Sequence, residues 1–173
     1  MKNLIIKYTI TTILFFVLSL IQSSFLPFFS IVGQIPNLVF ILFYVILFFD
    51  NRGESFFWAI LVGFLLDVFM PSYFGISIIS LLVIYLLKKI LDYFLKDIQG
   101  KYFIVYLIFL FSINFVIYSL LVYAFSLIFR SSYELSLSLM VSLAYNIILF
   151  LPAFYIYKFI ARPDYLENQL KLL

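Results

Sequence analysis

The feature that most constrains this chain is a stretch without charged residues that runs from Tyr8 to Phe49. A helix needs about 20 mostly apolar residues to cross roughly 30 Å of hydrocarbon, so this stretch is too long for one crossing. Pro27, Gly33 and Pro36 interrupt it. Proline is disfavoured inside a helix and suits a helix start. The stretch therefore predicts two apolar helices joined by a turn.

The composition of the whole chain points the same way. Of its 173 residues, 66% are apolar and 11% are charged, whereas a soluble domain has roughly 45–50% and 25%. We therefore expect an integral membrane protein. The chain has no cysteine and no histidine, which excludes disulfides, thiolate metal sites and imidazole catalysis. A net charge of +3 is too small to indicate a nucleic-acid partner.

Charge-free runs and helix breakers predict an all-α, six-helix transmembrane bundle in a single membrane domain, residues 1–173. The expected spans cover about 8–26, 36–49, 55–70, 75–87, 102–129 and 135–157. The third and fourth are short and could instead form a re-entrant hairpin. We favour full crossings, because an irregular turn exposed to lipid at mid-depth would leave backbone groups unpaired.

The segment 88–101 carries apolar residues on one helical face and charged residues on the other. This pattern predicts a short amphipathic helix on the inner membrane surface, and the alternative is a plain extension of the fourth span.

Six crossings put both termini on one side of the membrane, and the cations indicate which side. All lysines and arginines but one fall on the terminal side. They are Lys2, Lys7, Arg52, Lys88, Lys89, Lys96, Lys101, Lys158, Arg162 and Lys171. Arg130 alone falls on the other side. The positive-inside rule therefore predicts cytoplasmic termini.

Asp67 is the one carboxylate inside an expected span, and a charge there is a functional candidate by default. It lies about 20 Å beyond Glu54 at 1.5 Å per residue, toward the outer end of its helix. One interpretation is an aspartate near the headgroups, or one paired for structure. The other is an ion pair with Arg130 that fixes the third helix against the end of the fifth.

Further polar residues are expected at the same level as Asp67. They are Gln22, Ser23, Ser24, Gln34, Asn37 and Ser72. A polar vestibule, a docking surface for another protein, or ordinary helix-end polarity would each produce this pattern. Asn114 and Asn146 fit hydrogen bonds between helices better than ligand contacts.

The sequence has no glycine-rich phosphate loop, paired catalytic carboxylates, nucleophile elbow or metal-ligand cluster. We therefore expect no catalytic residue, no cofactor and no metal, and a protein that is not an enzyme.

The order of short motifs in the first half of the chain resembles the rod shape-determining protein MreD family of bacteria. The motifs, which cover about residues 10 to 90, are Gln22-Ser23-Ser24, Ile35-Pro36-Asn37-Leu38, Gly53, Gly63-Phe64-Leu65-Leu66-Asp67 and Gly75. The chain departs from the family at Asn37, where aspartate is common, and at Ala59, where glycine is common.

This resemblance implies a non-enzymatic scaffold subunit of the elongasome, the peptidoglycan synthesis machinery that maintains cell shape. It implies a multi-pass protein of the bacterial cytoplasmic (inner) membrane, surrounded by lipid, that binds MreC. Further partners would be MreB, RodA and a class B penicillin-binding protein. It also implies a fold similar to the substrate-binding subunits of energy-coupling-factor transporters. The family's shared positions would be Pro36, Asn37, Gly63 and Asp67, in structural or partner-facing roles. We expect the same kind of role for Gln22, Ser23 and Gly75, with Arg130 as the outward cation.

A second hypothesis is a substrate-capture subunit of a vitamin-type or lipid transporter, with a pocket near Asp67, Asn37 and Arg130. The lack of histidine and of a deeply buried charge pair argues against a proton-coupled carrier, but a capture subunit needs only a pocket.

Overall fold

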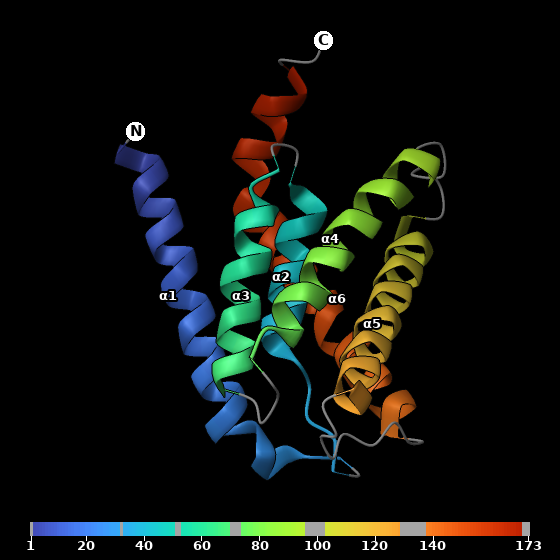
Figure 1. Ribbon diagram of the computed structural model, residues 1–173. Helices are drawn as coiled ribbons and strands as arrows, with labels where there is room; N and C mark the ends of the chain where they lie inside the picture. Colours follow the sequence, from blue (N-terminus) through green and yellow to red (C-terminus); the bar gives the residue numbers. More distant parts are fainter. Residues whose placement is uncertain are drawn as a thin grey trace.

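The computed structural model describes residues 2–31, 33–50, 53–69, 74–95, 103–128 and 138–170, and this part of the chain is helical (Figure 1). Its elements are α1 (Lys2–Ser24), the 3₁₀ helix η1 (Leu26–Phe29), α2 (Leu38–Phe49), α3 (Ser55–Phe69), α4 (Ile76–Leu95), α5 (Phe103–Ile128) and α6 (Ser138–Leu170). Within these residues the one β-type pairing is an isolated bridge between Ile31 and Gln34. The predicted order of six helices is confirmed.

The first two helices differ from their expected bounds because local hydrogen bonding decides where a helix stops. α1 ends at Ser24, and Pro27 lies in the separate η1 turn. α2 begins after Asn37 and not at Pro36, because the Asn37 side chain accepts a hydrogen bond from the Phe40 amide and caps the helix. Proline position alone does not reveal such a cap.

The fourth and sixth helices run further than their apolar stretches. α4 continues without a break to Leu95, so residues 88–95 extend the fourth helix and do not begin a separate one. α6 continues past residue 157 to Leu170. Hydropathy reports the length of apolar chain, whereas backbone hydrogen bonding can continue a helix into polar sequence, so both helices are longer than the expected spans. The extension of the fourth span was one of the two alternatives for residues 88–101.

Within the described part of the chain, three helices contain segments long and apolar enough to cross a membrane. These segments are Ile6–Ser24, Ile104–Phe125 and Leu139–Ile160. α2 and α3 are apolar but shorter. α2, with 12 residues, is about 18 Å long at 1.5 Å per residue.

The short helix α2 forms the centre of the bundle. It packs against α1, α3 and α6, and its residues are buried on all sides. The buried residues are Val39, Phe40, Ile41, Phe43, Tyr44, Val45, Ile46 and Leu47. A helix that is apolar all round is stable only inside a larger apolar environment, and the longer helices supply it.

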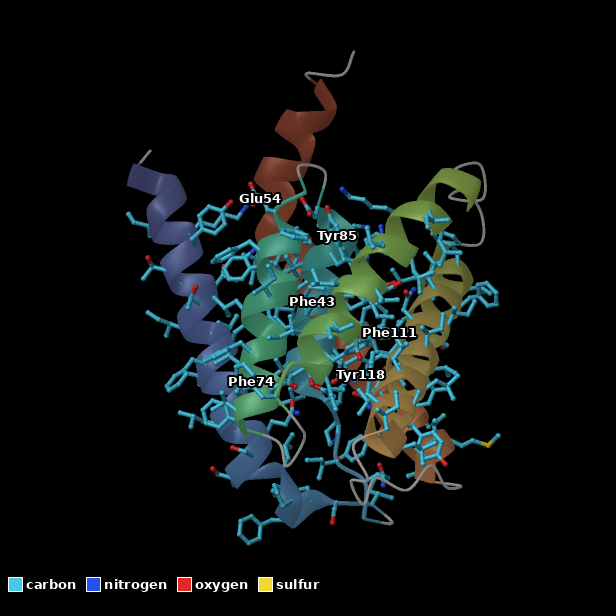
Figure 2. All side chains as sticks on the ribbon, in the orientation of Figure 1. Phe43, Glu54, Phe74, Tyr85, Phe111 and Tyr118 are labelled. Carbon is cyan, nitrogen blue, oxygen red and sulfur yellow. The ribbon has the colours of Figure 1, made fainter. Side chains whose placement is uncertain are left out.

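Aromatic side chains fill the space between α2, α5 and α6. Phe111 stacks on Phe150 with ring centroids 4.1 Å apart, and Tyr44 meets Phe111 edge-on at 5.4 Å. Phe40 contacts Tyr118 at 4.9 Å. Figure 2 shows Phe43, Phe111 and Tyr118 inside the bundle. These aromatic contacts form a specific core between the three helices.

The elements alternate between the two ends of the bundle. α1 begins and α6 ends at the same end, and α2 ends and α3 begins there too (Figure 1). η1, the start of α2 and the end of α3 lie at the opposite end. We call this second end the capping end, for the contacts described next.

Candidate functional site

The start of α2 is held by polar side chains from three parts of the chain. The first amides of a helix have no partner within the helix, and burying them unpaired is costly. Here the Val39 amide donates to Gln22 Oε1 at 3.1 Å, and the Asn37 amide donates to Asn146 Oδ1 at 2.8 Å. The Phe40 amide donates to Asn37 Oδ1 at 2.9 Å. We call Gln22, Asn37 and Asn146 the α2 cap.

The α2 cap joins α1, α2 and α6. Gln22 is 2% exposed and Asn146 is fully buried. Asn146 is itself oriented by α6, since its Nδ2 donates to the Ser142 carbonyl at 2.7 Å. The prediction that Asn146 bonds between helices is confirmed. In the sequence, Ser138, Ser142 and Asn146 are spaced four residues apart, which places them on one helix face but does not identify the partner of Asn146.

Asp67 performs the same task for α4. It is 6% exposed, and its two carboxylate oxygens accept from the Gly75 amide at 2.7 Å and the Ser77 amide at 2.9 Å. Gly75 has φ +100°, a conformation that L side chains rarely adopt. The structure thus uses Asp67 as a structural cap. Arg130, the partner expected in the ion-pair hypothesis, lies outside the described residues.

Asp50 is a further cap, at the start of α3, and sequence analysis did not select it. Its Oδ1 accepts from the Gly53 amide at 2.9 Å and the Glu54 amide at 3.2 Å, and its Oδ2 accepts from the Ser55 amide at 2.7 Å. An aspartate shortly before an apolar helix is a recognised capping signal, so the sequence did contain this information.

Gly63 lies where α3 and α4 approach each other closely. A Cβ atom at this position would lie 2.5 Å from the Ile78 Cα and 2.7 Å from the Ile78 nitrogen. These are backbone atoms, which cannot rotate away. Gly63 is therefore a packing residue, and the close approach exists although position 59 carries alanine.

Asn114 is a fully buried polar residue of α5. Its Nδ2 donates to the Tyr44 hydroxyl at 3.1 Å and to the Leu110 carbonyl at 2.8 Å. The first bond links α5 to α2, so the expected bond between helices is confirmed for Asn114. Its Oδ1 has no partner in the described part of the chain.

A pocket of about 180 Å³ lies beside the α2 cap, between α1, η1, α2 and α3. Its polar lining consists of Ser19, Gln22 and Ser23. The apolar lining is formed by Pro27, Ile35, Val39, Leu65, Leu66 and Phe69. Gln22 and Ser23, two of the predicted site residues, therefore line one cavity. Pro36, another predicted site residue, is buried and directly follows the lining residue Ile35 in the sequence. Phe69 in the last turn of α3 lines the same cavity as residues at the end of α1 and the start of α2, so these three helix ends lie at one level of the bundle.

The serine hydroxyls of the pocket are engaged by their own helix. Ser19 Oγ donates to the Phe15 carbonyl at 2.9 Å, and Ser23 Oγ donates to the Leu20 carbonyl at 3.2 Å. Among the described residues, no three histidine, cysteine, aspartate or glutamate side chains gather as metal ligands would. What the capping end offers chemically is hydrogen bonding beside an apolar cavity.

Comparisons of the chain with protein-family models, with curated proteins and with solved structures found no match.

Proposed function

We propose that this protein is a multi-pass subunit of the bacterial cytoplasmic membrane with both termini in the cytoplasm. Three apolar helices of sufficient length support membrane insertion. The distribution of lysine and arginine supports the orientation. The capping end, which on this proposal faces outward, includes the end of α3, so we also propose that α3 and α4 cross the membrane in full.

Within that membrane we propose a non-enzymatic scaffold that binds MreC and helps the elongasome keep cells rod-shaped. The observation that carries this proposal is the use of Asp67: both carboxylate oxygens accept from backbone amides of the next helix. Asn37 and Gly63 likewise serve capping and packing. The positions that carry the family resemblance thus build the bundle, which leaves its outer faces for partners.

Copurification tests the scaffold proposal. The chain is co-expressed with affinity-tagged MreC from the same genome, and the membranes are solubilised in mild detergent. We expect the chain to elute with MreC and not with an unrelated single-anchor protein that carries the same tag. Exchanging the MreC anchor for an unrelated anchor then reports whether the contact is made within the membrane. A chain that inserts into membranes but never elutes with MreC would contradict the proposal.

Association with MreB, RodA and a class B penicillin-binding protein follows from the same proposal. Depletion of the chain from its own bacterium should then make the cells lose their rod shape, as microscopy would reveal. Cells that stay rod-shaped after complete depletion would argue against a role in elongation.

The pocket favours a second candidate function, a substrate-capture subunit of a vitamin-type or lipid transporter. Its supporting observation is the cavity of about 180 Å³ beside Gln22. Mass spectrometry of the purified chain distinguishes the two functions. A stoichiometric bound vitamin, together with neighbouring genes for transporter ATPases, would favour capture. A neighbouring gene for an anchored coiled-coil protein would favour the scaffold.

A further inference from the structure

The side-chain amide of Gln22 has two polar atoms, and one of them is hydrogen-bonded to a described residue. Oε1 accepts from the Val39 amide at 3.1 Å, which fixes the side-chain orientation because only the oxygen can accept. Among the described residues, this is the one hydrogen bond of the Gln22 side chain, so Nε2 has no acceptor there. Gln22 is 2% exposed and lines the pocket. Nε2 is thus a donor in the cavity wall with no acceptor among the described residues, and a ligand oxygen can accept its hydrogen bond.

The rest of the pocket has the chemistry of a hydrocarbon site. Its other walls are largely apolar, with Leu65, Leu66 and Phe69 on α3 opposite the end of α1. Both serine hydroxyls already donate to carbonyls of their own helix. The volume of about 180 Å³ exceeds that of an engineered apolar cavity of roughly 150 Å³ that binds benzene, so a short segment of acyl chain fits.

We propose that this pocket holds an acyl chain of a membrane lipid, and that the carbonyl oxygen at the head of the chain accepts a hydrogen bond from Gln22 Nε2. The proposal rests on the membrane placement proposed above. The pocket lies where α1 ends and α2 begins, at the boundary between hydrocarbon and headgroups on that placement. This is the depth at which an acyl chain meets its carbonyl group. An intact phospholipid and a free fatty acid share this chemistry.

Photocrosslinking of the full chain tests the proposal. The purified chain in detergent is titrated with a phosphatidylcholine whose acyl chain carries a diazirine, and separately with a fatty acid carrying the same group. Crosslinked peptides are then mapped by mass spectrometry. We expect crosslinks to the end of α1 and the last turn of α3 that saturate and are displaced by unlabelled lipid. Crosslinks on the outer apolar faces should increase with lipid and resist displacement.

Two variants probe the pocket directly. Gln22→Glu keeps an oxygen for the Val39 amide but removes the Nε2 donor, so it should weaken binding by on the order of threefold to tenfold, the loss of one hydrogen bond. Gln34→Glu adds the same charge at the capping end outside the pocket lining, and is the control. Ser23→Phe should fill the pocket and remove the saturable crosslinks. Ser24→Phe, on an exposed neighbour outside the lining, should not.

The outcomes separate cleanly. Saturable crosslinks with phosphatidylcholine, with the fatty acid or with both support the proposal and identify the source of the chain. Crosslinks that never saturate with either probe, or equal effects of Ser23→Phe and Ser24→Phe, overturn it. Extraction of the chain from membranes by alkaline carbonate would instead overturn the membrane placement itself.

Discussion

At the residue scale, this protein places carboxylates where backbone amides need acceptors. Asp50 accepts from three amides at the start of α3, and Asp67 accepts from two at the start of α4. The start of a helix carries partial positive charge and unpaired donors, so a carboxylate there is stabilised electrostatically and by hydrogen bonds. A buried aspartate in an apolar bundle therefore has a structural explanation.

Replacing Asp67 tests its capping role. We expect Asp67→Ala to lower the free energy of unfolding by about 1.5–3 kcal/mol, the range for hydrogen bonds to charged groups, and Asp67→Asn to lower it by less because one oxygen acceptor remains. The measurement is thermal unfolding of the purified chain in detergent. Glu54→Gln is the control, since the Glu54 carboxylate makes no hydrogen bond within the described residues. Unchanged stability of Asp67→Ala would contradict the cap.

Gly63 gives a steric prediction at the same scale. Gly63→Ala would bring a methyl group to 2.5 Å from the Ile78 Cα, and α3 and α4 would have to separate. We expect a loss of about 1–3 kcal/mol, the usual cost of overpacking. Val68→Ala, on the exposed side of the same helix, should change stability by less than about 0.5 kcal/mol. Equal losses of stability in Gly63→Ala and Val68→Ala would contradict a close approach of α3 and α4 at Gly63.

At the element scale, α2 is a short apolar helix that depends on its neighbours. Its sides are covered by α1, α3, α5 and α6, and its first amides are satisfied by the α2 cap. Isolated helices of this length are marginal, so tertiary contacts supply most of its stability. The cap also ties two helices that are distant in sequence, because Asn37 and Asn146 lie 109 residues apart.

Substitutions of Asn37 distinguish a role of this side chain in capping α2 from a role in binding a ligand. Asparagine and aspartate cap helices about equally well, so Asn37→Asp should stay within about 0.5 kcal/mol of the original stability, while Asn37→Ala should lose about 1 kcal/mol. Thermal unfolding in detergent measures both. Were Asn37→Asp as destabilising as Asn37→Ala, the hydrogen bond to the Phe40 amide would not be the main role of this side chain.

At the scale of the whole molecule, the bundle brings the start of α1 and the end of α6 to one end (Figure 1). Glu54 and Tyr85 lie toward that end, and Phe74 lies toward the other (Figure 2). Lys88 and Lys89, which contact the rings of Phe48 and Tyr85, belong to the terminal end as well. This arrangement agrees with the orientation proposed from the cations.

Cysteine labelling tests the orientation. The chain has no cysteine, so a single cysteine can be introduced without removing others. Ser131 directly follows Arg130, the cation expected on the outer side. We expect Ser131→Cys to react with a membrane-impermeant maleimide in intact cells and Glu54→Cys to react only after the cells are opened. Labelling of both positions in intact cells, or the reverse pattern, would contradict cytoplasmic termini.

The sequence by itself determined the number, order and approximate bounds of the helices. Apolar length and breakers such as Pro27 and Pro36 act locally, so they can be read without knowing which helices meet. Sequence analysis also selected Gln22, Asn37 and Asp67, because polar groups are conspicuous in an apolar chain, and it selected Gly63 through the family resemblance. Their roles, apart from a structural use of Asp67 as one possibility, stayed open.

Only the tertiary structure decided what these residues do. Hydrogen bonds of about 3 Å require that helices be placed to within a fraction of that distance, and hydropathy carries no information about such placement. The meeting of Gln22 and Asn146 at the start of α2, the contact of Gly63 with Ile78 and the pocket beside Gln22 all depend on it. The sequence thus specified the helices, and their packing specified the caps and the cavity.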